Sequence, residues 1–207
     1  MEAQKEISQN IIGIDLGLKD LVVDSDGNKY ENPKFFCRSQ KALAKAQRVL
    51  ARRKKGSKRR EKAKMRLARK HAKVANQRKD YLHKLTRKLV NENQVIAIET
   101  LAVSNMQKNH NLAKSIADAS WSEFVRQLEY KSLWYGRELV GIDRWYPSSK
   151  RCFDCGHTVK KMPLNVREWT CPECGTIHDR DINAARNVLA AGLAASVCGE
   201  NVSPVLL

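Results

Sequence analysis

The sequence predicts an α/β protein that carries a long basic helical hairpin and a small zinc ribbon. Three observations favour this fold class. Short apolar runs that end at glycine or at an acid indicate buried strands. Between residues 38 and 92, glycine occurs once and proline is absent, which indicates helices. Two Cys-x-x-Cys pairs follow near the C-terminus. The 207 residues, 42% of them hydrophobic, suffice for one domain of ordinary size with a small insert.

The first strands are expected close to the N-terminus. Residues 11–16 read Ile-Ile-Gly-Ile-Asp-Leu and predict a buried strand. Residues 21–24 predict a second strand, and Asp26-Gly27 predicts a tight turn to a third near Tyr30. The chain should therefore open as a β-meander.

The basic segment predicts a nucleic-acid contact. Residues 38–88 hold 22 Lys and Arg against two acids, although the whole chain carries only +17. A solvated helix face mixes both signs, so this concentration indicates a polyanionic partner. Acidic protein and anionic membrane are the competing partners, but a membrane helix needs bulky apolar residues and the segment lacks Trp and Phe. The candidate contacts are Arg52, Arg53, Lys54, Lys55, Lys58, Arg59, Arg60, Lys64, Arg66, Arg69 and Lys70.

Two antiparallel arms are expected to meet at Gly56-Ser57 and to form a hairpin over about 38–92. The second arm, from Lys58, should be about 50 Å long at 1.5 Å per residue. Apolar residues near 3.5-residue spacing predict its packing stripe. Those residues are Met65, Ala68, Ala72, Ala75, Leu82 and Leu89, facing Leu43, Ala46 and Leu50 on the first arm.

Later segments complete the predicted domain. Residues 94–99 predict a buried strand that ends in a carboxylate, and residues 139–145 predict another strand. Residues 111–136 predict a helix, and residues 181–193 predict an amphipathic helix. The packing face expected for the first of these helices holds Trp121, Phe124, Leu128 and Trp134.

The cysteine spacing predicts a structural zinc ribbon. Two Cys-x-x-Cys turns with fifteen residues between them can close one tetrahedral Cys₄ site. Its ligands would be Cys152, Cys155, Cys171 and Cys174. Two disulfides or four incidental thiols are the alternatives. The sequence shows no signal-peptide pattern and no run of eighteen apolar residues, so we expect a reducing, cytoplasmic setting without a membrane.

Three carboxylates in apolar surroundings are candidate metal ligands. Asp15 lies within an apolar strand, Glu99 ends another, and Asp181 opens the last helix. Each has a simpler account: a turn cap, a solvent-facing strand end and a helix N-cap. Together with a polyanion-binding hairpin, they indicate a site for two Mg²⁺ or Mn²⁺ ions, the arrangement used for phosphodiester hydrolysis.

The motifs together resemble the TnpB (OrfB) proteins of bacterial and archaeal insertion sequences. The matching segments are 13–17 (Gly-Ile-Asp-Leu-Gly), 96–100 (Ile-Ala-Ile-Glu-Thr), 147–150 (Pro-Ser-Ser-Lys), the two cysteine pairs and 179–185 (Asp-Arg-Asp-Ile-Asn-Ala-Ala). The resemblance implies a RuvC-like domain of RNase H fold that is interrupted by the zinc ribbon. It implies domain limits at 1–147, 148–178 and 179–207. It also implies that Asp15, Glu99 and Asp181 are the catalytic acids, with Asp181 preferred over Asp179.

The resemblance implies a prokaryotic, nucleoid-associated, RNA-guided DNA endonuclease. The family's N-terminal half, a β-barrel and a recognition lobe, is expected to be absent because the first catalytic strand begins at Ile11. Two functions remain open. One is a Mg²⁺-dependent nuclease module that acts on single-stranded or R-loop DNA and partners with guide RNA. The other is a non-cleaving nucleic-acid-binding subunit that assembles with itself or with full-length TnpB. An actin-like ATPase shares the Gly-Ile-Asp-x-Gly strand, but a second glycine-rich phosphate loop is missing.

Overall fold

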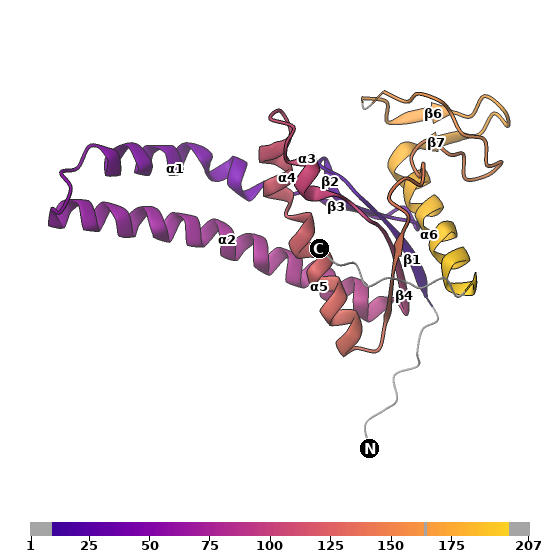
Figure 1. Ribbon diagram of the computed structural model, residues 1–207, viewed down its shortest axis with the longest axis horizontal. Helices are drawn as coiled ribbons and strands as arrows, with labels where there is room; N and C mark the ends of the chain where they lie inside the picture. The colour runs from indigo at the N-terminus through magenta and orange to yellow at the C-terminus, as the bar shows by residue number, and fades with distance from the viewer. Residues whose placement is uncertain (1–9, 164, 199–207) are drawn as a thin grey trace, which may run out of the picture.

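The computed structural model describes residues 10–163 and 165–198 (Figure 1). Within them the strands are β1 (Ile11–Leu16), β2 (Asp20–Asp24), β3 (Lys29–Glu31), β4 (Val95–Glu99), β5 (Glu138–Ile142), β6 (Glu168–Thr170) and β7 (Ile177–Asp179). The helices are α1 (Phe35–Ala51), α2 (Lys58–Glu92), α3 (Val103–Met106), α4 (Ala113–Ala119), α5 (Trp121–Trp134) and α6 (Arg180–Cys198). Within these ranges, no helix is long and apolar enough to cross a bilayer.

The main sheet has the strand order β3-β2-β1-β4-β5. β1, β2 and β3 form the antiparallel meander expected from the sequence, whereas β4 and β5 run parallel to β1. The carboxyl ends of β1, β4 and β5 therefore meet at one edge of the sheet. The mixed α/β class predicted from the sequence is confirmed, and the small β6-β7 sheet stands apart within the ribbon.

Helices cover both faces of the sheet (Figure 1). On one face, Ile12 and Ile14 of β1 pack with Leu89 of α2 and with Phe124 of α5 in a single buried cluster. On the other face, α6 packs against β1, β4 and β5. Because side chains alternate along a strand, Gly13 and Asp15 point to the α6 face.

Glycine allows α6 to approach the sheet closely. A Cβ atom at Gly13 would lie 2.2 Å from the carbonyl oxygen of Ala185 and 2.6 Å from the backbone nitrogen of Leu189. A Cβ atom at Gly192 would lie 2.5 Å from the Cβ of Ala97. No side chain fits at Gly13 without moving the helix backbone. The first motif of the sequence therefore fixes where α6, and the acid in its first turn, lies relative to β1.

The basic hairpin projects from the domain as two antiparallel helices (Figure 1). Ser57 caps α2, because its hydroxyl accepts the backbone N–H of Arg60. Gly56 precedes it with φ +78°, a conformation that favours glycine. The guanidinium of Arg60 donates to the carbonyl oxygens of Leu50 and Arg53 and so ties the end of α1 to the start of α2.

The stripe predicted for α2 is correct near the domain and wrong toward the hairpin tip. Leu82 and Leu89 are buried as expected. Met65 is 54% exposed, and Ala68, Ala72 and Ala75 are exposed as well. The buried apolar residues of α2 are Ala63, Val74, Leu82, Leu85, Leu89 and Val90. Toward the tip, α2 packs against α1 (Figure 1), so fewer of its apolar positions are buried than the spacing predicted.

The helix predicted over 111–136 is broken into α4 and α5. Ser120 separates the two helices with φ 55° and ψ 45°, the left-handed conformation that ends an α-helix. Trp121, Phe124 and Leu128 are buried as expected, but Trp134 is 73% exposed. Its place on the packing face was a wrong prediction. Trp134 lies in the last turn of α5, beyond the part that the core covers, and its ring contacts Tyr130 edge-on.

Asp118 of α4 holds the base of the hairpin. Its carboxylate accepts the backbone N–H groups of Phe36 and Cys37, at the start of α1, and a guanidinium N–H of Arg78 on α2. Lys34, the residue before α1, provides no side-chain cap. Asp118, which is distant in the sequence, takes the place of a capping residue. Burial opposes the charge, but these hydrogen bonds prevail and lower the pKa of Asp118.

Asp118→Ala is expected to lower the free energy of unfolding by about 2–4 kcal/mol, because it leaves two helix-start N–H groups and Arg78 unpaired. Asp80→Ala, which removes an exposed pair with Lys84, should cost no more than about 0.5 kcal/mol. Since the pKa of Asp118 is depressed, its contribution should be present above about pH 4 and be lost as the pH falls further. Urea denaturation measures the free energy of unfolding of both variants across this pH range. Equal losses of stability in Asp118→Ala and Asp80→Ala would contradict the role of Asp118 at the base of the hairpin.

Candidate active site and zinc centre

Asp15 and Glu99 lie side by side at the carboxyl edge of the sheet. β1 and β4 are parallel, with Ile14 opposite Ile98, so the next positions along both strands are Asp15 and Glu99. Both alternate onto the face that α6 covers. Neighbouring parallel strands thus bring together two acids that are far apart in the sequence.

Asp181 stands in the first turn of α6 at the same face. The N-cap of this helix is Asp179, whose Oδ1 accepts the backbone N–H groups of Asp181 and Ile182 at 3.0 and 3.1 Å. Asp179 also pairs with Lys29 at 2.6 Å. The simpler account of Asp181 as a helix cap is therefore wrong. Its carboxylate instead faces Arg167 of the ribbon at 3.4 Å.

The pKa of Asp15 depends on its burial and on the two acids near it. Burial, followed by the negative charges of Glu99 and Asp181, raises the pKa of Asp15 well above its usual value, against the opposing effect of Arg180 and Arg167. Burial also raises the pKa of Glu99. Two carboxylates that resist ionisation, Asp15 and Glu99, therefore form the centre of a site that favours a cation.

The spacing of the acids limits what they could hold. Among the described residues, the carboxylate oxygens of Asp15, Glu99 and Asp181 do not all lie within 4.8 Å of one another. In this arrangement they therefore do not enclose a single ion. Two divalent ions about 3.5–4 Å apart need a wider set of ligands. Hard oxygen donors around a buried anionic edge are the chemistry that Mg²⁺ or Mn²⁺ requires.

Ser148 connects Glu99 to α6. Its hydroxyl donates to Glu99 Oε1, and this hydrogen bond counters the effect of burial on the pKa of Glu99. The carbonyl of Ser148 accepts from Asn187 at 2.9 Å. Asn183 and Asn187 also donate to the carbonyl of Arg151, at 2.8 and 2.7 Å. Two buried amides of α6 thus fix the segment that orients Glu99. Sequence reasoning noted the 147–150 motif but assigned Ser148 no part in the site.

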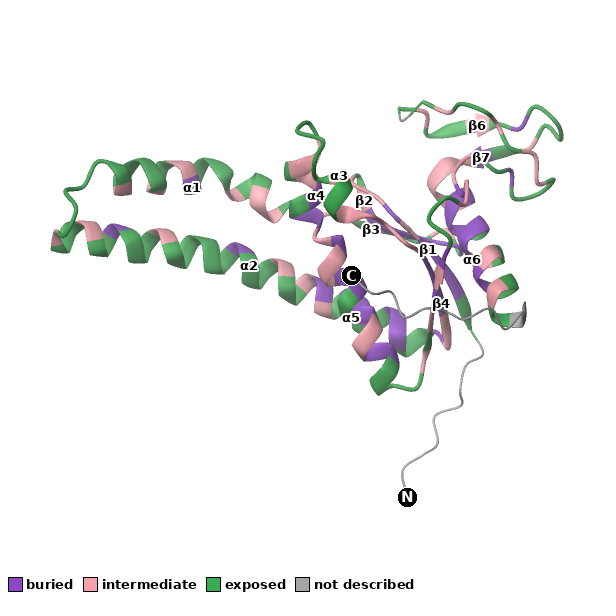
Figure 2. Cartoon of the chain, in the orientation of Figure 1, coloured by how far each residue is buried: buried purple, intermediate pink, exposed green. Residues whose placement is uncertain are grey.

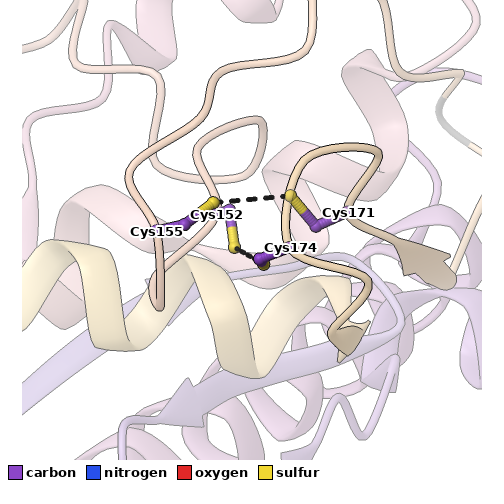
Figure 3. Close-up of side chains that lie close together, drawn as sticks. All are labelled: Cys152, Cys155, Cys171 and Cys174. Carbon is purple, nitrogen blue, oxygen red and sulfur yellow. Dashed lines mark hydrogen bonds between the residues drawn. The ribbon is translucent and has the colours of Figure 1, made fainter.

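The four cysteines meet in one cluster beside α6 (Figure 3). The Sγ atoms of Cys152 and Cys174 are 3.7 Å apart, and those of Cys155 and Cys171 are 3.6 Å apart. A tetrahedral site with Zn–S bonds of about 2.3 Å has edges of about 3.8 Å. The cysteines are free thiols, so the disulfide alternative does not describe this arrangement. The residues fit a closed Cys₄ zinc site.

Two equivalent turns carry the ligands. In the first, the N–H of Gly156 donates to the carbonyl of Cys152, and in the second, the N–H of Gly175 donates to that of Cys171. Both glycines have positive φ, 77° and 74°. The hydroxyl and backbone N–H of Thr176 lower the pKa of Cys174 to about 6, which favours the thiolate form that binds metal.

His178 links the cysteine cluster to the segment that begins at Asp179. Its Nε2 lies 3.0 Å from Cys152 Sγ, and its ring packs on Trp169 of β6. His178 is buried and is followed directly by Asp179, the N-cap of α6. A hydrogen bond from an outer residue orients a metal ligand. The cluster is thereby connected to Asp179, which lies two residues before Asp181.

Chelation at neutral pH is expected to release one Zn²⁺ per chain and to unfold residues 148–178, because structural zinc binding is coupled to folding. Cys171→Ser should do the same without a chelator. Cys37→Ser, which changes an exposed free thiol elsewhere, is the matched control. Zinc release can be followed with a metallochromic dye, and unfolding by limited proteolysis. A protein that contains no zinc and has its thiols oxidised in pairs would contradict the assignment.

The predicted nucleic-acid contacts lie on the exposed arm (Figure 2). Arg60 is half-buried because it braces the hairpin turn. The other predicted residues are exposed: Arg52, Arg53, Lys54, Lys55, Lys58, Arg59, Lys64, Arg66, Arg69 and Lys70. A two-helix projection with this charge can lie along a phosphate backbone.

The fold and site define a mixed α/β protein with a carboxylate edge, a Cys₄ cluster and a basic arm. Residues 1–110 match the OrfB_IS605 family, described as "Probable transposase", and residues 121–188 match the Cas12f1-like TNB domain. The first match covers more than half of the chain. The chain belongs to the TnpB/OrfB family of insertion-sequence proteins, as the sequence motifs indicated.

Relatives support this assignment. A protein of Streptomyces pristinaespiralis named "Putative RNA-guided DNA endonuclease" is 56% identical over 93% of this chain and 48% of its own length. The InsQ protein of Escherichia coli K12, which carries the same description, is 40% identical over 94% of this chain and 52% of its own length. The chain thus spans about half the length of these curated relatives. A cryo-EM structure of a Cas12f1-sgRNA-target DNA complex shares the fold, with a TM-score of 0.63 at 18% identity over 86% of this chain and 49% of that one.

Proposed function

We propose that this chain is the metal-dependent nuclease module of a TnpB-type RNA-guided DNA endonuclease. The proposal rests on one observation: Asp15, Glu99 and Asp181 come from separate elements to the carboxyl edge of the sheet, where burial and then the charges of Glu99 and Asp181 raise the pKa of Asp15. We assign residues 1–147 and 179–207 to a RuvC-like domain of RNase H fold and residues 148–178 to the zinc ribbon. Its partners are a guide RNA and DNA in single-stranded or R-loop form.

Each group of residues in the site has a separate role in phosphodiester hydrolysis. Asp15, Glu99 and Asp181 would hold two Mg²⁺ or Mn²⁺ ions, which supply an activated water and stabilise the leaving oxygen. Ser148 keeps the Glu99 carboxylate oriented. Arg167, half-exposed beside Asp181, is placed to contact a phosphate when the carboxylates are occupied. The basic arm holds the nucleic acid by its backbone.

The competing function is a non-cleaving nucleic-acid-binding subunit that assembles with itself or with full-length TnpB. The exposed basic arm favours it, because binding needs none of the acids. Incubation of the chain with single-stranded DNA in Mn²⁺, Mg²⁺ or Ca²⁺ separates the two functions. A nuclease should cut in Mn²⁺ or Mg²⁺ and only bind in Ca²⁺. Tight binding without cutting in any of these ions, by the chain alone and with a full-length relative, would favour the subunit.

Ser148→Ala is expected to shift the pH at which Mn²⁺ binds upward. The reason is that the Ser148 hydroxyl favours the ionised form of Glu99, so its loss raises the pKa of Glu99 further above the usual value. The Glu99 carboxyl then keeps its proton to a higher pH, and a metal ion must displace that proton in order to bind. Ser149→Ala changes a neighbouring serine and should leave the profile in place. Titrating Mn²⁺ by electron paramagnetic resonance at several pH values measures the shift, and an unchanged profile for Ser148→Ala would contradict the role.

A further inference from the structure

Trp145 is held in solvent next to the carboxylate edge. Its side chain is 80% exposed, although burying an indole would remove a large apolar surface from water. It follows β5 by three residues, and β5 ends at Ile142, the residue paired with Glu99. At 3.8 Å per residue, its Cα lies within about 11 Å of the Cα of Ile142.

The loop that carries Trp145 is fixed at both ends beside Glu99. At one end, the hydroxyl of Thr100 donates to the carbonyl of Ile142 at 2.9 Å. At the other end, Ser148 donates to Glu99 itself. The loop that carries Trp145 is therefore anchored beside Glu99 at both ends.

The interior of the loop is also ordered by its own contacts. Asp143 Oδ1 accepts the backbone N–H of Trp145 at 2.6 Å, and the carbonyl of Asp143 accepts the N–H of Tyr146 at 3.2 Å. Tyr146 packs against Ala97, Ile142 and Val188. The loop turns Tyr146 inward and Trp145 outward, so the exposure of Trp145 is a consequence of its fold.

The immediate surroundings of Trp145 are charged. The guanidinium of Arg144 lies 5.0 Å from the centre of the indole ring, and Asp143 is exposed beside it. A protein-binding patch would present several apolar side chains together. Such a group exists at the end of α5, where Leu133, Trp134 and Tyr135 are all exposed. A single aromatic ring beside a cation is instead the arrangement that stacks nucleobases while contacting phosphate.

We infer that Trp145 is a stacking platform for an unpaired base of the DNA strand that enters the carboxylate edge, with Arg144 against the adjoining phosphate. The inference rests on the proposed function, because it requires that this edge receive a single strand. Stacking fixes the position of a nucleotide without reading its sequence, since every base has an aromatic face. Trp145 would thus position the strand relative to Asp15, Glu99 and Asp181.

The test compares strands with and without bases. Binding of the chain to a single-stranded DNA oligonucleotide, and to an abasic strand of the same length, is measured in Ca²⁺ for the wild type and three variants. Trp145→Ala should weaken binding to the base-bearing strand about tenfold and leave the abasic strand unaffected. Trp145→Phe keeps a ring and should bind nearly as the wild type does. Trp134→Ala removes a similarly exposed indole elsewhere and should change neither affinity.

Each result decides the inference. If Trp145→Ala binds the base-bearing strand as the wild type does, or loses affinity equally for both strands, the stacking role is overturned while the proposed function stands. An equal loss for Trp134→Ala would also overturn it. If the wild type binds no single-stranded DNA, the proposed function and the inference fail together. Thermal unfolding of Trp145→Phe and Trp145→Ala shows whether either change acts through the fold instead, which would count against stacking.

Discussion

Asp15→Ala is expected to reduce DNA cleavage by about a thousandfold or more, because it removes a metal ligand at which the reacting groups are stabilised. Binding of single-stranded DNA should persist or improve, since one negative charge that repels phosphate is lost. Asp26→Ala removes an exposed acid from the β2-β3 turn and is the matched control. Cleavage and binding are measured with the same labelled strand, in Mn²⁺ and Ca²⁺ respectively.

The same variant should be more stable than the wild type when divalent cations are absent. The pKa of Asp15 is raised in the folded protein, first by burial and then by Glu99 and Asp181. Its ionised form therefore destabilises the fold, and that cost begins above about pH 4 and grows as the pH rises toward the raised pKa. Mg²⁺ should stabilise the wild type and have little effect on Asp15→Ala. Equal cleavage by Asp15→Ala, or equal stabilisation of both proteins by Mg²⁺, would contradict the assignment.

Reversing four charges at the hairpin tip is expected to have the second largest effect. Substitution of Arg52, Arg53, Lys54 and Lys55 by Glu should weaken nucleic-acid binding steeply. If each contacts one phosphate of a single strand, the slope of log affinity against log salt should fall by about 3. Stability should change little, because all four side chains are exposed.

Fluorescence anisotropy over a range of salt concentrations measures this slope, with DNA and with RNA. Lys108→Glu changes an exposed lysine outside the hairpin and serves as a control for the general loss of positive charge. An affinity that does not depend on salt would show that the arm does not bind phosphates. An unchanged slope in the four-residue variant would place the contacts elsewhere on the protein.

Local patterns predicted the elements that depend on local physics. The apolar runs at 11–16 and 94–99 form β1 and β4 because their β-branched residues favour buried strands. The hairpin could be predicted because the segment lacks helix breakers except at Gly56. The Cys-x-x-Cys spacing predicted the cysteine cluster because each turn brings two thiols together on its own.

Contacts between distant segments could not be predicted in the same way. The sequence places Asp179 and Asp181 two residues apart. The hydrogen bonds at the start of α6 show that Asp179 is the cap, whereas the carboxylate of Asp181 pairs with Arg167. Ser148 reaches Glu99 because α6 amides hold its backbone. Trp134 reads as a core residue by spacing, but α5 continues beyond the part that the core covers. In each case, tertiary packing decides between roles that the local sequence allows equally.

The metal site can be tested directly by anomalous diffraction at the manganese edge from crystals of this chain soaked in Mn²⁺. We expect two peaks, about 3.5–4 Å apart, between the carboxylates of Asp15, Glu99 and Asp181. Crystals of Asp15→Ala should lack at least one of them. The absence of manganese from this edge in the wild type, at concentrations that support cleavage, would show that these carboxylates do not hold the metal ions.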